Sequence, residues 1–261
     1  MAPHILAVTN QKGGVGKTTT AINLATALAA VGSRCLVIDL DPQGNASTGL
    51  GITWTERQTS AYDLLTGMSA LSAIARPTRV EGLDIVPGTV DLASIEIALG
   101  SEMRRTHRLR HALSAAEVGG YDFILIDCPP ALNLLTINAL VAAQAVLVPL
   151  QCEFFALEGL SQLLKTIREI RETVNPALRI QGVVLTMYDA RNKLSEQVAE
   201  DVRQNLGALV MKTVIPRNVR LSEAPSHGIP VLLYDQRSSG SIAYQRLAAE
   251  LLAVTQPEPT V

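Results

Sequence analysis

Lys12-Gly13-Gly14-Val15-Gly16-Lys17-Thr18-Thr19 follows the short apolar run Ile5–Val8 and precedes the helical pattern of residues 21–30. A strand that breaks into glycines, reads Gly-Lys-Thr and continues as a helix is the context of a phosphate-binding loop. The glycines let backbone N–H groups turn toward a polyphosphate, and the helix N-terminus adds positive charge. Lys17 would reach the β- and γ-phosphates, and the Thr18 hydroxyl would ligate Mg²⁺. We therefore expect a nucleoside triphosphate site rather than a glycine-rich turn without a ligand.

The loop departs from the usual pattern G-x-x-x-x-G-K-[ST] at its first position, where Gln11 stands in place of glycine. A second lysine, Lys12, follows directly. This variant resembles the deviant Walker A motif of the ParA/MinD/nitrogenase-iron-protein group of ATPases.

Length and composition favour one α/β domain, which we place at residues 1–254, with a disordered tail at 255–261. The chain has 261 residues, of which 48% are hydrophobic and only 3% aromatic. That balance suits helices rich in Ala and Leu packed on strands rich in Val and Ile. Three cysteines without C-x-x-C spacing indicate neither a disulfide framework nor a zinc site, which favours a reducing cytoplasm. No signal peptide or membrane-spanning run is evident, so we expect a soluble protein.

Charge is unevenly distributed along the chain. The net charge is −2, yet residues 165–246 hold 12 Lys and Arg against 8 Asp and Glu. A basic patch in the C-terminal half of an acidic protein would suit nucleic acid, although ordinary solvated helix faces remain an equal alternative.

Short apolar runs recur with helical segments between them. Near-continuous runs of this kind are typical of strands buried on both faces, which predicts a doubly wound, mostly parallel sheet with helices on both sides. Ligands bind such sheets at the carboxyl ends of the strands. The predicted strands are Ile5–Val8, Cys35–Ile38, Leu83–Val86, Phe123–Ile126, Ala145–Leu150, Ile180–Leu185 and Val214–Ile215.

Carboxylates follow two of these runs. Asp39 and Asp41 come at the end of the second run, where either could position water for attack on the γ-phosphate or support the metal. The alternative is a turn or helix cap before Pro42. Asp127 ends the fourth run, and an apolar strand that ends in Asp is the Walker B pattern, whose carboxylate holds Mg²⁺.

Four basic residues are candidates for contacts to DNA phosphates. Arg217 and Arg220 lie three apart where a helix would begin, and Arg191 and Lys193 come earlier. No helix-turn-helix signature is evident, which favours backbone contacts without base readout.

The basic segment 103–113 is read as a solvated helix, because Leu109 and Leu113 mark a buried stripe. His107 and His111 are then surface residues rather than metal ligands. Whether Arg104, Arg105 and Arg108 contact DNA stays open.

Together these motifs resemble those of the ParA/Soj-type chromosome-partitioning ATPases. The resemblance spans residues 4 to about 235. The motifs that carry it are Asn10-Gln11-Lys12-Gly13-Gly14-Val15-Gly16-Lys17-Thr18-Thr19, Asp39-Leu40-Asp41-Pro42-Gln43-Gly44-Asn45, Ile126-Asp127-Cys128-Pro129-Pro130, residues 153–159 and residues 215–228.

The resemblance implies an ATP-dependent sandwich dimer with two nucleotides at its interface. Lys12 of one subunit would reach the phosphates bound by the other. Asp41 would activate the attacking water, Asp39 would support the metal site, and Asp127 would be the Walker B acid. Residues 12–19 would bind the nucleotide, with Thr18, Asp39 and Asp127 at the magnesium ion.

The remaining implications concern the base and the partners. Pro216 and Asn218 would lie near the adenine. Arg191 and Arg220, together with our candidate Arg217, would bind double-stranded DNA non-specifically on the nucleoid in the cytoplasm. A ParB-type protein would stimulate hydrolysis and release. The alternative within the family is an orphan ATPase that positions a cytoplasmic protein cargo.

Three rivals share the phosphate-binding loop. A MinD-type membrane protein would need a basic amphipathic C-terminal helix, which residues 256–259, Gln-Pro-Glu-Pro, cannot form. A nitrogenase-iron-protein reductase would need two well-placed cysteines, and only Cys152 lies in a plausible loop. A ligase of the dethiobiotin-synthetase kind would not need paired arginines near Pro216.

Overall fold

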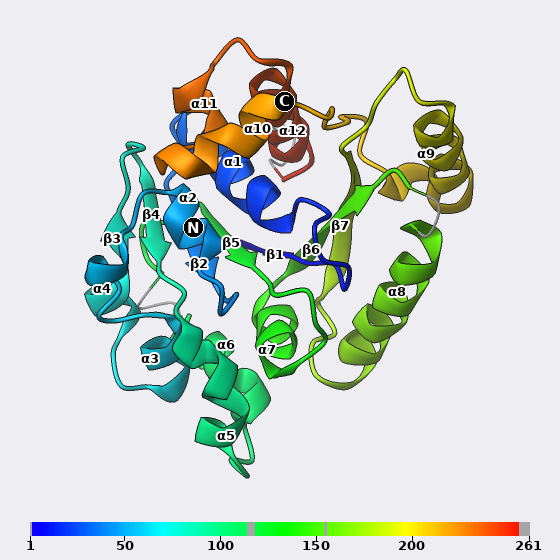
Figure 1. The fold of residues 1–261 in the computed structure, drawn as a ribbon. Helices are drawn as coiled ribbons and strands as arrows, with labels where there is room; N and C mark the ends of the chain where they lie inside the picture. Colours follow the sequence, from blue (N-terminus) through cyan, green and yellow to red (C-terminus); the bar gives the residue numbers. More distant parts are fainter. Residues whose placement is uncertain (1, 114–117, 154–155, 256–261) are drawn as a thin grey trace, which may run out of the picture.

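A seven-stranded sheet forms the centre of the fold (Figure 1). The computed structural model describes residues 2–113, 118–153 and 156–255. The strands are arranged β3-β4-β2-β5-β1-β6-β7, and every neighbouring pair is parallel except β3 with β4. In chain order they are β1 His4–Val8, β2 Cys35–Asp39, β3 Arg76–Pro77, β4 Leu83–Val86, β5 Phe123–Asp127, β6 Ala145–Gln151 and β7 Arg179–Thr186.

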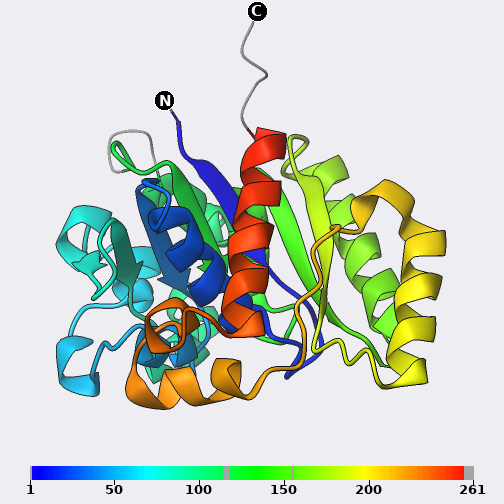
Figure 2. The same ribbon diagram turned by 90° about the horizontal axis from the view of Figure 1, so that it is seen from above.

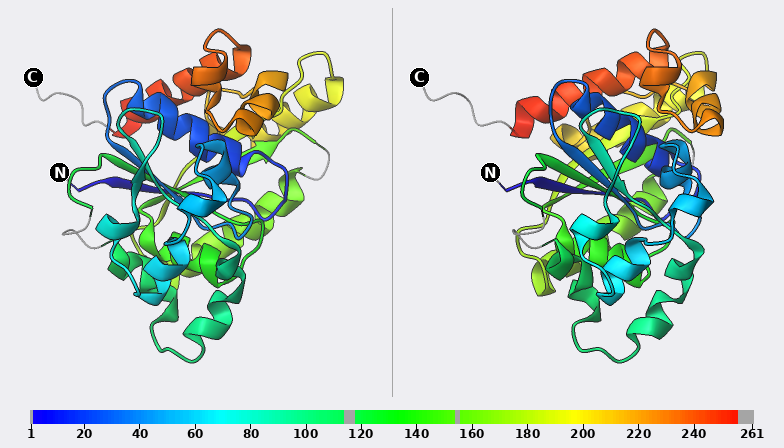
Figure 3. Two further views of the ribbon diagram at one scale, coloured as in Figure 1. Left: turned by 60° about the vertical axis from the view of Figure 1, so that its left-hand side comes forward. Right: turned by 90° about the vertical axis from the view of Figure 1, so that its left-hand side faces the viewer.

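Helices cover both faces of this sheet, which confirms the predicted doubly wound class (Figures 1 and 3). One face carries α1, α2, α10, α11 and α12, and the other carries α3 to α8. The helices are α1 Lys17–Ala29, α2 Asn45–Gly49, α3 Ala61–Thr66, α4 Leu71–Ile74, α5 Ile95–Leu99, α6 Arg108–Ala112, α7 Leu134–Ala142, α8 Ala156–Thr173, α9 Lys193–Leu206, α10 Val219–Glu223, α11 Val231–Tyr234 and α12 Ser239–Thr255.

Two hydrophobic cores, one on each face, explain why the strands read as continuous apolar runs. Successive side chains of a strand point to opposite faces. In β1, Leu6 and Val8 pack with the core beneath α1 and α12, whereas Ile5 and Ala7 pack with the core on the opposite face. Both sets must therefore be apolar.

The register brings the carboxyl ends of three strands together. Asp127 at the end of β5 pairs with Val8 of β1 and with Asp39 of β2. The phosphate-binding loop, which starts where β1 ends, therefore lies beside both carboxylates. Figure 2 shows this edge of the sheet opposite the end that holds the start of β1 and the last turn of α12.

The structure corrects the strand prediction at two places. Val214–Ile215 is not a strand, although the Ile215 N–H donates to Leu185 O at 2.8 Å. The pairing stops at an isolated bridge between Tyr188 and Pro216, because Pro216 has no N–H with which to continue a ladder. The two-residue strand β3 was not predicted, since it carries no apolar run.

Other predictions about organisation fare as follows. Residues 105–112 are helical, with Leu109 and Leu113 buried as predicted. Thr255 ends α12, and the rest of the predicted tail lies outside the described residues. Among the residues that the structure describes, no helix combines the length and the apolar character that crossing a membrane requires.

Candidate active site

The phosphate-binding loop joins β1 to α1 and is anchored to the two strands beyond β1. Asn10 Nδ2 donates to Pro149 O of β6 at 2.8 Å, and Thr186 Oγ1 of β7 donates to Val15 O at 2.9 Å. Gly14 and Gly16 have φ angles of 77° and 89°, which residues with a Cβ rarely adopt. These anchors fix the loop before any ligand arrives.

Lys17 begins α1 and folds back over the loop. Its Nζ donates to Lys12 O at 2.8 Å, and the residue is only 6% exposed. Burial lowers the pKa of Lys17, while the Asp127 and Asp41 carboxylates act in the opposite direction. The ammonium group is thus held against the loop, where it can donate to a phosphate oxygen in place of the Lys12 carbonyl.

Asp127 is a fully buried carboxylate whose two oxygens have no hydrogen-bond partner among the described residues. Burial raises its pKa well above the usual range, and the neighbouring Asp39 adds to that rise, whereas Thr18 and Lys17 lower it. A buried, unsatisfied carboxylate is costly unless a ligand compensates it. Its oxygens therefore fit a magnesium ion or the water bound to one.

The donor set also fits magnesium rather than a metal held by protein alone. Within the described ranges, no group of three or more His, Cys, Asp or Glu side chains is suited to hold a metal ion. Mg²⁺ usually takes one or two carboxylates, retains several waters and shares the oxygens of substrate phosphates. Thr18 and Asp127 supply that kind of incomplete site.

Asp39 differs from Asp127 because protein donors occupy both of its oxygens. Ser47 donates to Oδ2 from its N–H at 2.9 Å and its hydroxyl at 2.7 Å, and the Asp41 N–H lies 3.2 Å from Oδ1. Burial raises the pKa of Asp39 to about 6. Asp39 holds the turn that carries Asp41, and its predicted contact with the metal stays a prediction.

Asp41 faces a cavity of about 510 Å³ at the carboxyl edge of the sheet. The glycines of the loop, Lys17, Thr18 and Asp41 line this cavity together with Pro129 and Met187. One carboxylate oxygen of Asp41 accepts the Gln43 N–H at 3.0 Å, as a turn residue would. The turn and the catalytic interpretation of Asp41 are therefore compatible.

A second cavity, of about 290 Å³, continues from the first. The two cavities share Gly16, Thr19 and Met187. The second one is lined by Pro216 and Asn218, the two residues predicted to lie near the adenine. The pair of cavities thus offers one space that suits phosphates and a smaller one that suits a base.

Lys12 lines neither cavity and forms an ion pair with Glu153 of the same chain. Its side chain is 43% exposed. The lysine is therefore available at the surface of the cleft, where a partner molecule could meet it.

The three predicted DNA-binding arginines lie on neighbouring segments. The Arg217 N–H donates to Tyr188 O at 2.9 Å, which joins the segment before α10 to the segment after β7 that carries Arg191. Arg191 makes two bonds of 3.0 Å to Asp189, yet its side chain is 90% exposed. Arg217 is exposed as well.

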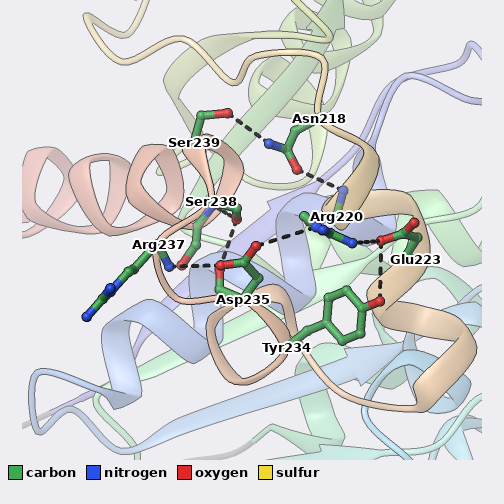
Figure 4. Close-up of polar contacts among 9 residues, drawn as sticks. Asn218, Arg220, Glu223, Tyr234, Asp235, Arg237, Ser238 and Ser239 are labelled. Carbon is green, nitrogen blue, oxygen red and sulfur yellow. Dashed lines mark hydrogen bonds and ion pairs between the residues drawn. The ribbon is translucent and has the colours of Figure 1, made fainter.

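Arg220 is held by two carboxylates, as Figure 4 shows. Its Nη1 donates to Glu223 Oε2 at 2.7 Å, and its Nε lies 3.5 Å from Asp235 Oδ2. Its own N–H donates to Asn218 Oδ1 at 2.9 Å, so a residue of the base cavity caps the helix that carries this arginine. Half of the Arg220 side chain remains exposed.

Comparison with known proteins places the chain in a family. The AAA domain family matches residues 3–180. The chromosome partitioning protein ParA of Caulobacter vibrioides is 61% identical over 96% of this chain and 94% of its own. The sporulation initiation inhibitor protein Soj of Bacillus subtilis is 53% identical over 95% and 98%. The chain belongs to the ParA/Soj family of chromosome-partitioning ATPases.

Solved structures of proteins with other functions share the fold. Cobyrinic acid a,c-diamide synthase of Mycobacterium smegmatis, solved with ADP and magnesium, matches with a TM-score of 0.83 at 38% identity, over 96% of this chain and 94% of its own. The cell division ATPase MinD of Pyrococcus furiosus matches with a TM-score of 0.80 at 28% identity, over 98% and 100%. The extensive identity to ParA favours chromosome partitioning over the cargo-positioning alternative.

Sequence reasoning missed two residues of this ParA/Soj-family site. Thr186 anchors the loop, and Met187 lines both cavities with a left-handed φ of 51°. A polar residue at the end of an apolar strand, as at Asp127, was the available signal for Thr186. Met187 gave none, because methionine rarely adopts such a backbone.

Proposed function

We propose that this chain binds ATP and Mg²⁺ at the carboxyl ends of β1, β2 and β5 and hydrolyses the nucleotide as a homodimer. The observation that supports this best is the buried Asp127 carboxylate, which lies close to Thr18 and Lys17. Neither of its oxygens has a hydrogen-bond partner among the described residues. Residues 12–19 bind the phosphates, Thr18 and Asp127 hold the ion with Asp39 behind them, and Pro216 and Asn218 flank the adenine.

The groups of the cleft divide the work of hydrolysis. Bound Mg²⁺ would supply positive charge against the phosphate oxygens. Lys17 exchanges its bond to Lys12 O for the β- and γ-phosphates. Asp41 accepts a hydrogen bond from the attacking water and orients it in line with the leaving group.

Lys12 makes the nucleotide a link between two subunits. It leaves Glu153 and places its ammonium on the phosphates bound by the partner, as an arginine finger does when it is supplied in trans. The exposure of both side chains of the present ion pair keeps the cost of that exchange small.

The dimer binds double-stranded DNA non-specifically through Arg191, Arg217 and Arg220. Each subunit alone offers a weak phosphate-binding patch, and joining two patches raises affinity without new contacts. Hydrolysis removes the link, and a ParB-type protein stimulates it. The chain would then cycle on and off the nucleoid in the cytoplasm.

The variant Asp41→Ala tests this cycle. We expect it to bind ATP and DNA and to form the dimer, while its turnover falls by about 10²-fold or more, because the base that orients water is lost. Glu81→Ala, at an exposed position before β4, is the matched control and should keep full turnover. Full ATPase activity in Asp41→Ala, measured by phosphate release, would remove Asp41 from the mechanism.

A further inference from the structure

Arg57 is a buried arginine whose role the proposed mechanism leaves open. It is only 5% exposed and lies in the chain after α2, the helix that follows the Asp41 turn. Its guanidinium donates to Gly44 O at 3.1 Å, Thr48 Oγ1 at 2.7 Å and Ile52 O at 2.8 Å. It also lies 3.5 Å from Gly88 O. One side chain thus gathers acceptors from two separate segments.

None of these acceptors is a carboxylate. Among the described residues, Arg57 forms no ion pair, and burial lowers its pKa while Asp39 acts in the opposite direction. Burying a charge on neutral acceptors is costly unless its donors are well satisfied. This arrangement indicates that Arg57 serves to fix the positions of the acceptor groups, Gly44 O, Thr48 Oγ1 and Ile52 O.

The contact with Gly44 leads directly to Asp41. The Gly44 N–H donates to Asp41 O at 2.9 Å, so a single residue links the arginine to the backbone of the candidate base. Gly44 has a φ of 62°, and a Cβ at this position would collide with the Arg57 guanidinium and with Gly88 O. Glycine is therefore required for the guanidinium to approach this turn.

Asp39 and Ser47 hold the same turn from the other side. Ser47 Oγ donates to Asp39 and accepts the Gly88 N–H at 2.9 Å, while Arg57 lies against the carbonyl of Gly88. The Asp41 turn is thus fixed between two buried polar groups. Asp39 contacts the segment 44–52 through Ser47, whereas Arg57 donates to both its first residue, Gly44, and its last, Ile52.

Arg57 also has an optical reporter. Its guanidinium carbon lies 4.4 Å from the ring centre of Trp54, a cation–π contact. Trp54 is the only tryptophan of the chain and is 62% exposed. Its fluorescence therefore reports whether the guanidinium stays in place.

We propose that Arg57 is a positioning residue for ATP hydrolysis, which holds the turn Asp41–Gly44 against the phosphate-binding loop by its bonds to Gly44, Thr48 and Ile52. This inference rests on the proposed role of Asp41. A displacement of about 1 Å at a reacting group can cost about 10²-fold in rate. Loss of Arg57 therefore lowers the rate of hydrolysis without removing a contact to the nucleotide.

The test compares Arg57→Met, Arg57→Lys and Thr48→Val with Arg79→Met. Methionine fills the site without donors, and lysine keeps the charge but cannot reach three acceptors at once. Thr48→Val removes the hydroxyl that accepts from Arg57, together with the bond of 3.1 Å that this hydroxyl donates to Gly44 O. Arg79 is exposed and lies near Gly51, at the same segment, so Arg79→Met is the matched control. Each variant is measured for kcat, for KM of ATP, for melting temperature and for Trp54 emission.

We expect kcat to fall roughly tenfold or more in Arg57→Met and severalfold in Arg57→Lys and Thr48→Val. KM for ATP should stay within about twofold of the native value in all of them. The Trp54 emission should change in the two Arg57 variants and stay native in Thr48→Val and Arg79→Met. Native kcat in Thr48→Val overturns the proposal even if Arg57→Met fails to fold. So does a parallel loss of kcat, ATP affinity and melting temperature, which indicates a general structural role.

Asp41→Ala, measured alongside, separates the two hypotheses. If Asp41→Ala is inactive and the Arg57 and Thr48 variants are fully active, only the positioning role fails. If Asp41→Ala keeps full turnover, the role of Asp41 fails and the inference fails with it.

Discussion

At the scale of single residues, the three aspartates at the carboxyl ends of β2 and β5 differ in what surrounds them. Asp39 accepts three protein hydrogen bonds, Asp41 lines the cavity, and Asp127 is buried with no partner among the described residues. An unsatisfied buried carboxylate destabilises the fold, and it persists where function needs it. Asp127 is therefore where activity and stability conflict most directly.

We predict that Asp127→Asn stabilises the nucleotide-free protein by about 1–3 kcal/mol, because the amide is less costly to bury than the carboxylate. Turnover should be lost, and so should the stabilisation of the fold by Mg²⁺ and ATP. Thermal unfolding with and without Mg²⁺ and ATP measures the two changes in stability, and phosphate release measures turnover. Asp122→Asn, before the other end of β5, is the control and should not raise stability, since Asp122 accepts the Arg34 N–H at 2.8 Å.

The same carboxylate predicts a dependence of stability on pH. A folded-state pKa raised above the unfolded value means that the native chain binds the proton more tightly. Its free energy of unfolding should then fall as pH rises from about 4, the unfolded pKa, through the raised folded pKa. This fall should be smaller in Asp127→Asn, and an identical pH profile in the two proteins would contradict the assignment.

The residue pattern could identify these aspartates but could not distinguish their roles, which were assigned only through the family resemblance. Each follows an apolar run, and the pattern is the same for a metal ligand, a base and a turn residue. The distinction depends on Ser47, which reaches Asp39 from α2, and on burial by both faces of the sheet. Such contacts are set by tertiary packing, as are the buried position of Arg57 and the left-handed backbone of Met187.

At the scale of elements, α10 connects the cavity proposed for the base to the surface proposed for DNA. The helix has five residues and depends on its cap: Asn218 accepts the Arg220 N–H, and its Nδ2 donates to Ser239 Oγ at the start of α12 (Figure 4). The cap residue lines the cavity, and the helix carries Arg220. Both Asn218 and Arg220 belong to the motif at residues 215–228 that the sequence analysis singled out. The strand expected at Val214–Ile215 was wrong, since this segment is a connection that runs alongside β7.

We predict that Glu223→Gln raises DNA affinity roughly two- to fivefold, because a surface ion pair of this kind restrains Arg220 only modestly. Removing the acid frees Nη1 and leaves Asp235 at 3.5 Å as the remaining carboxylate. Glu200→Gln on α9 is exposed and changes the net charge equally, so it controls for the general electrostatic effect. Fluorescence anisotropy on a short duplex measures both; equal gains in the two variants would exclude a specific effect on Arg220.

At the scale of the whole molecule, the proposed binding of DNA would have to overcome a net charge of −2. The local excess of cations in residues 165–246 left a basic patch and ordinary solvated helix faces as equal alternatives. Of the three candidate arginines, Arg191 follows β7, Arg217 precedes α10 and Arg220 lies within α10. Sequence could not predict that Asp189, Glu223 and Asp235 would lie against two of these arginines. A single subunit therefore presents its positive charge partly neutralised, and two subunits are expected to bind far better than one.

The salt dependence of DNA binding tests whether ATP joins two such patches. Each phosphate contact contributes about −0.9 to the slope of log K against log salt concentration. With Arg191, Arg217 and Arg220 in each subunit, the ATP-bound dimer should show a slope of about −5 and a single subunit about −3. Lys12→Ala should bind ATP without forming the dimer in light scattering with a slowly hydrolysed analogue, and it should show the smaller slope. Equal slopes for the native protein and Lys12→Ala, at equal nucleotide occupancy, would mean that DNA is bound by one subunit at a time and that Lys12 plays no part in coupling ATP to DNA.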